Sequence, residues 1–456
     1  MNESVDDMRK SDLVSHGLKQ RHVTMITFGG MIGAGLFVGS GSALHNAGPG
    51  VVAVYLAVGL IVYLIMRMLG EMATSRPISG TFVEYTAASL GPWAGFLTGW
   101  MYWYFWVFTI GAETVAGANL LRDIGLDLPT WAIGVGIILV LAATNALSVK
   151  AYGEVEFWLA SIKVFSIIGF IATAAIFIIG GRGVDLDPLS TGQGLFPHGV
   201  GGLLAAVPVV VFSMVGSEIA AVAAAESDRP AENIARAARS VALRTILFYV
   251  CSVGAIALII TPAEALPGLS PFSIALRKTG VPGADVVMTW VVITAVLSCL
   301  NSGLYITSRM LFSLGSSGHA PRLFSRTNSR KVPVWGLLVG LIAGIAAAFG
   351  QMFMDGDAFS LLAGASGNII LFIYALIILA EIKQRTDMER AGDAIKCGVP
   401  LFPFLSWATL VSIFAIVGFL AMDVNQRETL VISLASICIL FVAMGMRTMM
   451  TQHSKG

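Results

Sequence analysis

Three long stretches of this chain contain no Asp, Glu, Lys or Arg: residues 22–66, 85–112 and 188–217. A helix needs about 20 mostly apolar residues to cross the hydrocarbon core of a bilayer, and each stretch is long enough to supply one. Only 12% of the 456 residues are charged, whereas soluble domains contain about 25%. The sequence therefore predicts an all-α polytopic membrane protein and excludes an ordinary soluble domain.

Apolar segments with few charges recur along the whole chain, and each predicts one membrane-spanning helix. Twelve spans are expected, at residues 23–44, 49–69, 92–119, 129–148, 157–180, 200–225, 242–261, 285–311, 333–353, 358–380, 400–421 and 429–447. Because their number is even, both termini lie on one side of the membrane. Residues 1–22 and 448–456 are expected to be short polar tails, and no cleavable signal peptide is indicated.

The distribution of Lys and Arg predicts which side holds the tails. Positively charged side chains are enriched in the cytoplasmic loops of membrane proteins. If the tails are cytoplasmic, the inner loops and tails contain most of the 28 Lys and Arg residues. The outer loops then contain only Arg122, Arg182, Arg277, Lys278 and Arg427. We therefore expect both termini in the cytoplasm.

The first span contains two glycines, Gly33 and Gly35, that are two residues apart. Glycine is disfavoured in helices by about 1 kcal/mol relative to alanine, and this spacing puts the pair on different helix faces. Local unwinding would expose backbone amides that can hold an anion and carbonyls that can hold a cation. Close helix packing is the alternative. We expect packing for the glycines spaced four apart, namely Gly91, Gly95, Gly99, Gly336, Gly340 and Gly344.

The sixth span has a matching interruption at Gly216, which is followed by Ser217 and Glu218. This span comes five after the first one. Broken helices at corresponding positions of two halves are a sequence sign of an inverted-repeat transporter with its substrate site at the breaks. We expect a first five-helix repeat at residues 23–180, a second at residues 200–380, and two added helices at residues 400–447.

Three ionisable residues are expected inside the membrane: Lys163 in the fifth span, Glu113 in the third and Glu218 in the sixth. Such residues are costly in hydrocarbon and are functional candidates. Lys163 either reaches toward the cytoplasmic end of its span or forms a buried amine that exchanges a proton. Glu113 is expected to bind a nearby hydroxyl or backbone group. Glu218 either binds the freed amides of the break or exchanges protons.

Other side chains narrow the possible functions. Phe212, four residues before Gly216, either packs in the core or closes a site. The six histidines are scattered and the four cysteines have no metal or redox spacing, so no metal, cofactor or enzyme activity is expected, and the cysteines are predicted to be buried apolar residues. The net charge of +1 and the lack of a basic tract indicate no nucleic acid partner.

Several motifs together carry a family resemblance. In chain order they are LKQRHVTMITFGGMIGAGLFVGSG, MRMLGEMATSRPISGTF, SVKAYGEVEFWLASIKV, VFSMVGSEIAAVAAAESDRP and VLSCLNSGLYITSRMLFSL. Over nearly the whole chain, this pattern resembles the amino-acid transporter family of the amino acid–polyamine–organocation superfamily. Within that family, the sixth span is most similar to the bacterial permeases for 4-aminobutyrate (GABA).

The resemblance implies a LeuT-like fold, with five plus five inverted helices and two added helices, in the bacterial inner membrane. It implies alternating access and proton symport, with an amino acid and a proton as partners beside membrane lipid. The oligomeric state is left open, and a monomer would suffice. The matching positions for the substrate carboxylate are Ile32, Gly33, Ala34 and Gly35, and those for the ammonium group and cavity are Phe212, Ser213, Val215 and Gly216. Lys163 matches the lysine that is proposed to couple protons in the family, and Glu218 matches the acid after the break of the sixth span. Together with Glu113, they are the candidates for proton coupling.

The substrate and transport mode stay open at this stage. GABA is the leading substrate, and an aromatic, proline-like, branched or basic α-amino acid is the alternative. Two other functions also stay open: an amino acid exchanger, and an amino acid sensor that transports nothing.

Overall fold

The computed structural model describes residues 32–76, 81–146, 149–181, 194–216, 218, 242–243, 245–265, 268–353, 358–395 and 398–453. The predicted amino-terminal tail, the beginning of the first span and the second part of the sixth span lie outside the described residues.

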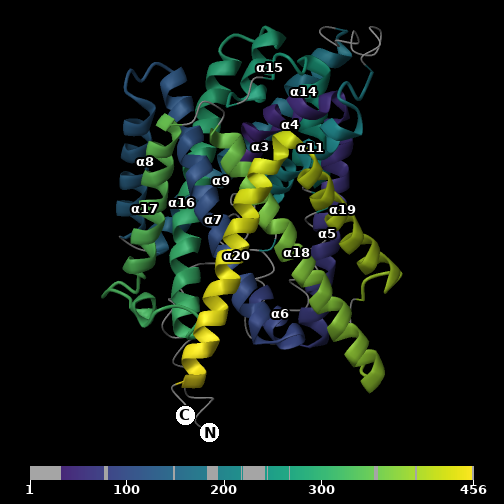
Figure 1. Ribbon diagram of the computed structural model, residues 1–456. Coiled ribbons are helices and arrows are strands. Elements are labelled where there is room, and N and C mark those ends of the chain that lie inside the picture. Colours follow the sequence, from purple (N-terminus) through teal and green to yellow (C-terminus); the bar gives the residue numbers. More distant parts are fainter. Residues whose placement is uncertain are drawn as a thin grey trace.

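The described residues form helices and connecting turns, without strands (Figure 1). The first part of the chain contains α3 (Ala34–Phe37), α4 (Gly39–Ala47), η1 (Gly48–Gly50), α5 (Val51–Ser75), α6 (Phe82–Leu90), α7 (Pro92–Asp123), α8 (Thr130–Asn145) and α9 (Val149–Ile179). The second part contains α11 (Gly199–Met214), η2 (Thr245–Val250), α14 (Cys251–Ile259), α15 (Pro271–Thr279), α16 (Ala284–Ser316), η3 (Arg322–Ser325), α17 (Val334–Gly350), η4 (Gln351–Phe353), α18 (Ala358–Ala391), α19 (Phe404–Met422) and α20 (Val424–His453).

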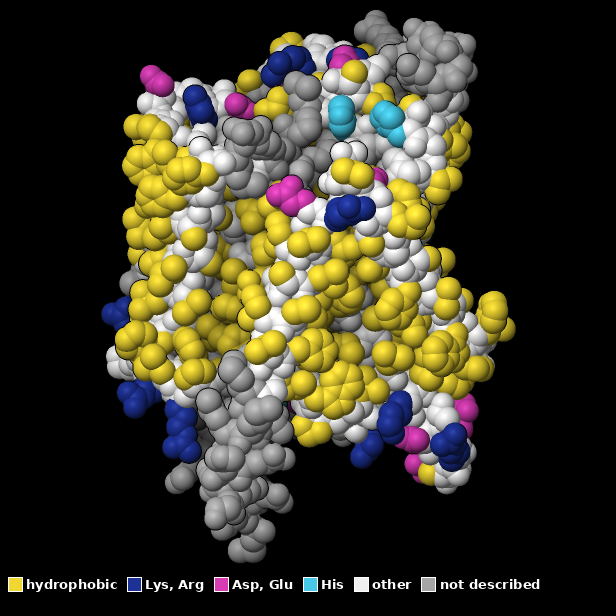
Figure 2. Space-filling model, in the orientation of Figure 1, with side chains coloured by type: hydrophobic (Ala, Val, Ile, Leu, Met, Phe, Trp, Pro, Cys, Tyr) yellow, Lys and Arg dark blue, Asp and Glu magenta, His cyan; other side chains and the backbone are white. Residues whose placement is uncertain are grey.

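Each of the predicted spans contains helical residues. Seven continuous helical segments of the described chain are long and apolar enough to cross a membrane: 39–75, 156–179, 284–316, 334–353, 358–391, 404–422 and 424–442. Three shorter apolar helical segments cover 130–145, 199–214 and 245–259. On the face seen in Figure 2, apolar side chains cover the middle, and most charged side chains lie toward the two ends. This is the architecture of a multi-pass membrane protein.

Helix α7 is a central element of the bundle. It packs against α6, α8, α16, α17 and α18, and Figure 1 shows it between α8 and α17 on one side and α18 on the other. Its sequence is rich in Trp and Tyr, whose large rings fill the space around it. One helix thus contacts many of the others.

The glycines spaced four apart serve close packing, as predicted. Gly336 lies against the backbone of Ser308, and Gly340 lies against Leu304, both on α16. Gly344 continues the same stripe of α17 against α8. Gly91 differs from this pattern because it forms the turn between α6 and α7 with φ +107°, a conformation that L side chains rarely adopt.

One predicted boundary was too short and one helix was missed, because only apolar residues were counted. Helix α18 continues through a charged segment to Ala391, stabilised by the i,i+4 ion pairs Lys383–Asp387 and Arg385–Glu389. Helix α6 was not predicted; it begins with a capping box in which Thr81 and Glu84 bind each other's backbone amides.

The prediction of buried cysteines is correct only for Cys299. Cys251 and Cys438 are exposed on the helix surface, and Cys397 lies outside the described residues. The reason is that the lipid-facing surface of a membrane protein is as apolar as its interior, so an apolar sequence does not distinguish the two.

Candidate functional site

The first span is interrupted at its described beginning. Ile32 and Gly33 precede α3, and Gly33 is extended with φ −132° and ψ −153°. A helix then begins at Ala34, and a turn at Val38 separates α3 from α4. The structure differs from the expectation at Gly35, which lies inside α3 and is helical rather than unwound.

Both glycines allow close approach of other helices. A Cβ atom on Gly33 would lie 2.5 Å from Oε1 of Glu113 and 2.8 Å from Sγ of Cys299. A Cβ atom on Gly35 would lie 2.6 Å from Cα of Ser213. The two positions therefore join the interrupted first span to α7, α16 and α11, and neither position has room for a methyl group.

The sixth span is interrupted as well. Helix α11 ends at Met214, Val215 is extended, and Gly216 has φ +109°, where glycine is strongly favoured. The backbone N–H of Gly216 donates to both carboxylate oxygens of Glu218, each at 3.1 Å. The hydroxyl of Tyr102 on α7 lies 3.5 Å from the same carboxylate. Glu218 thus binds a freed amide of the break, which is the structural one of its two expected roles.

The last turn of α11 presents backbone carbonyls beside this break. The Ser213 carbonyl accepts a hydrogen bond of 2.7 Å from the hydroxyl of Tyr249, so one of its two lone pairs is already used. The Phe212 carbonyl accepts a longer bond of 3.4 Å from the Val215 N–H. The ring of Phe212 packs edge-to-face on Phe359 of α18 and is buried.

Glu113 connects the third span to the interrupted first span. It is 1% exposed. The backbone N–H of Ala34, the first residue of α3, donates to its Oε1 at 3.0 Å and its Oε2 at 3.2 Å. A carboxylate of the protein itself therefore binds the Ala34 amide, for which a substrate carboxylate was the expected partner.

Lys163 is fully buried in α9 and does not extend to a polar surface. Its Nζ donates to Oγ of Ser298 on α16 at 2.8 Å. The same nitrogen lies 3.9 Å from Oε1 of Glu156, and it interacts electrostatically with Glu113. Lys163 and Glu113 thus belong to one polar region formed by α3, α7, α9 and α16.

Sequence reasoning missed Glu156 and Ser298. Glu156 precedes Lys163 by two helical turns, so the two residues share a helix face, and this spacing could have revealed the pair. Ser298 gave no such signal, since a serine in an apolar span usually bonds its own helix backbone.

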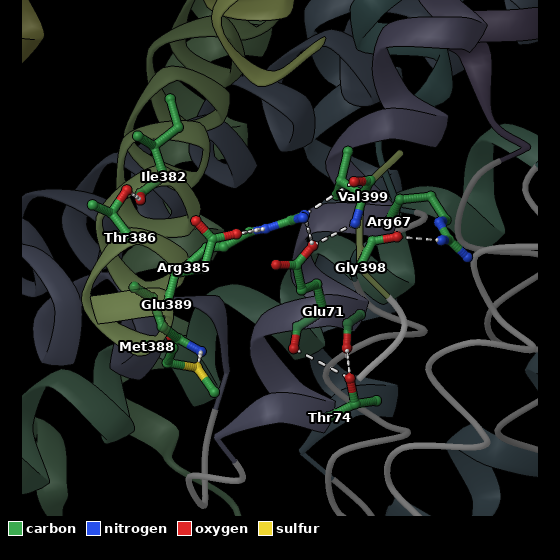
Figure 3. Close-up of polar contacts among 12 residues, drawn as sticks. Arg67, Glu71, Thr74, Ile382, Arg385, Thr386, Met388, Glu389, Gly398 and Val399 are labelled. Carbon is green, nitrogen blue, oxygen red and sulfur yellow. Dashed lines mark hydrogen bonds and ion pairs between the residues drawn. The ribbon is translucent and has the colours of Figure 1, made fainter. Parts of the chain in front are cut away.

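A second buried polar cluster lies at the carboxyl-terminal ends of α5 and α18 (Figure 3). Oε2 of Glu71 accepts hydrogen bonds from Nη1 of Arg385 at 3.2 Å and from the N–H of Val399 at 2.5 Å. Arg67 donates to the Gly398 carbonyl at 2.9 Å. Glu381, one turn before Arg385, is fully buried and interacts electrostatically with Glu71. We call these residues the inner cluster: Arg67, Glu71, Glu381, Arg385, Gly398 and Val399. The inner cluster joins α5 and α18 to the segment that precedes α19.

Comparison with known proteins identifies the family of this chain. Residues 22–454 match the amino acid permease family, almost the whole chain. The chain belongs to the amino acid permease family. It is 41% identical over 438 residues to the gamma-aminobutyric acid permease of Bacillus subtilis (strain 168), which covers 95% of this chain and 92% of that relative.

Two further permeases of the family show the range of similarity. The gamma-aminobutyric acid permease of Escherichia coli (strain K12) is 38% identical over 430 residues, covering 93% of this chain and 92% of the relative. The aromatic amino acid transport protein AroP of Corynebacterium glutamicum is 34% identical over 421 residues, covering 90% of each chain. The protein is therefore an amino acid permease, a transporter and not an enzyme.

Proposed function

We propose that this permease is a proton-coupled symporter that imports a small zwitterionic amino acid, with GABA as its substrate, across a bacterial inner membrane. This substrate is supported by the relatives that are named GABA permeases, which are 38–41% identical to this chain. An α-amino acid substrate is the second candidate, because an aromatic amino acid transport protein is 34% identical.

The contact between Glu113 and the Ala34 amide supports proton coupling most directly. An amide that binds one carboxylate can bind another, so the substrate carboxylate competes with Glu113 for it. A protonated Glu113 carries no negative charge and is a weaker acceptor, since charge-assisted hydrogen bonds are about twice as strong as neutral ones. Proton uptake by Glu113 would therefore free the amide for the substrate, which links the two events.

The rest of the proposed site follows from the interrupted sixth span. The substrate carboxylate would bind the amides around Ile32, Gly33, Ala34 and Gly35. The ammonium group would bind the carbonyls of Phe212, Ser213 and Val215, with Tyr249 keeping its bond to Ser213. Gly216 leaves room beside the break, and Phe212 covers the substrate.

Transport would proceed by alternating access between two inverted five-helix repeats, residues 23–180 and 200–380, with 400–447 added. The Lys and Arg distribution supports cytoplasmic termini. Lys163 passes the proton onward in this scheme, and Glu218 holds the broken sixth span in shape.

The test is uptake of labelled GABA into proteoliposomes of the full-length protein, with an imposed pH gradient and a panel of competing amino acids. We expect accumulation that requires the gradient, does not require sodium, and is competed best by GABA. A sodium requirement, or no response to the gradient, would contradict proton symport. Stronger competition by an aromatic amino acid would select the second candidate.

The role of Glu113 is tested by Glu113→Gln, with the exposed Glu264→Gln as control. Glutamine is neutral at every pH, so substrate binding by the variant should not weaken as the pH rises, whereas that of the wild type should. Binding that keeps the wild-type pH dependence in Glu113→Gln would show that another group is responsible.

A further inference from the structure

Helix α9 carries two fully buried groups of opposite charge, Lys163 and Glu156. Side chains on a helix lean toward its amino-terminal end, so Lys163 reaches back toward Glu156. Their charged atoms are 3.9 Å apart and do not form a direct hydrogen bond of ordinary length. The hydroxyl of Ser298, from α16, joins them.

Ser298 gives this chain of hydrogen bonds a direction. Its Oγ accepts from Nζ of Lys163 at 2.8 Å and donates to Oε1 of Glu156 at 2.6 Å. An ammonium group can only donate and a carboxylate can only accept, whereas a hydroxyl does both. The hydrogen bonds therefore run from Lys163 through Ser298 to Glu156.

We propose that Glu156 receives the transported proton from Lys163 through Ser298 and releases it toward the cytoplasm. This inference rests on the proposed proton symport. In the step, an N–H bond of Lys163 breaks as its proton bonds to Oγ of Ser298. The original O–H bond of Ser298 breaks as the hydroxyl proton bonds to Oε1 of Glu156. The products are a neutral amine, an unchanged serine and a neutral carboxylic acid, so atoms and charge balance.

The position of Glu156 fits release on the inner side. It lies two turns, about 10 Å, closer than Lys163 to the amino-terminal end of α9, which the Lys and Arg distribution assigns to the cytoplasm. Among the described residues, Oε2 of Glu156 has no hydrogen-bond partner, so this oxygen can pass a proton onward.

In the part of the chain that the structure describes, Lys163 is the charged group that acts on Glu156, and Ser298 is its hydrogen-bond partner. Glu113 on α7 interacts with Lys163, and the buried thiol of Cys299 adjoins Ser298 on α16. Helices α8, α14 and α15 also pack against α9. Within the described part of the chain they contribute no charged group to the surroundings of Glu156.

The test uses the full-length protein in proteoliposomes and two assays. One is accumulation of labelled GABA driven by a pH gradient, and the other is counterflow of GABA at equal pH, which needs no net proton movement. Glu156→Gln keeps the shape and the acceptor oxygen but cannot take the proton. We expect accumulation to fall by about a hundredfold, with counterflow retained.

Ser298 provides a second pair of variants in case Glu156→Gln does not fold. Ser298→Ala removes the hydroxyl and should lose accumulation while keeping counterflow, and Ser298→Thr keeps the hydroxyl and should restore accumulation. The inference is overturned if Glu156→Gln accumulates GABA like the wild type. It is equally overturned if folded Glu156→Gln loses counterflow too, or if Ser298→Ala accumulates normally. Failure of the wild type to respond to the gradient would instead refute the proposed symport.

Discussion

The candidate site and the inner cluster both bury a glutamate that accepts a hydrogen bond from a distant backbone amide, but their cations differ. Glu71 binds the amide of Val399 beside Arg385, and arginine does not lose its proton in proteins. Glu113 binds the amide of Ala34 and interacts electrostatically with Lys163. A buried lysine can lose its proton. The first arrangement is suited to holding helices together, and the second to changing its charge.

The largest effect is expected at the candidate site, from Gly33→Ala. The added methyl group would lie 2.5 Å from Oε1 of Glu113 and would displace it. A shift of about 1 Å at a reacting group can cost a hundredfold in rate, and we expect GABA uptake to fall by about that factor. Gly136→Ala is the matched control, because no atom lies within 4 Å of its added Cβ. Normal uptake by Gly33→Ala would remove Glu113 from the mechanism.

The inner cluster should respond in stability instead. Arg385→Met leaves the carboxylate of Glu71 buried without its guanidinium partner, which costs about 3–5 kcal/mol. Thermal unfolding in detergent should show a large drop in melting temperature. Lys383→Met breaks an exposed ion pair on the same helix and should cost less than about 1 kcal/mol. Equal melting temperatures for the two variants would mean that Arg385 is not a structural partner.

Glu218 is an intermediate case, since it caps the break in the sixth span and, among the described residues, its partners are the Gly216 amide and the Tyr102 hydroxyl rather than a cation. Glu218→Gln keeps one acceptor oxygen for the Gly216 amide but loses the charge. We expect a stability loss of about 1–2 kcal/mol and an unchanged pH profile of uptake, measured in proteoliposomes. A shifted pH profile would assign Glu218 to proton exchange.

The smallest loss of stability is expected from breaking an exposed ion pair. This loss is the reference with which the losses at the buried pairs are compared. Glu264 binds Lys278 at 2.7 Å. Burial opposes ionisation, but the Lys278 and Thr261 hydrogen bonds outweigh it and lower the pKa of Glu264 below its ordinary value of 4.5. The pair therefore stabilises the protein above pH 4.5, and this contribution is lost as the pH falls through the lowered pKa. Glu264→Gln should cost less than about 1 kcal/mol at pH 7, and melting temperatures should converge with the wild type in acid.

The sequence predicted features that depend on neighbouring residues along the chain. Long uncharged segments revealed the spans, and glycines revealed the breaks at Gly33 and Gly216. Residues 314 apart, such as Glu71 and Arg385, give no local signal that they pair. The same holds for Ser298, whose role depends on a neighbour 135 residues away. Composition and spacing thus predict where the helices break, and tertiary packing determines which side chains meet there.

Helix α7 makes contact with both interrupted spans, through Tyr102 to Glu218 and through Glu113 to Ala34. These two positions are about 16 Å apart along the helix axis, at 1.5 Å per residue. Each residue added to a helix turns everything beyond it by about 100°. A single insertion between Tyr102 and Glu113 would therefore aim one of them away from its span. Substitutions along this stretch can be absorbed by repacking, but a change in its length cannot, and the segment should tolerate neither insertion nor deletion.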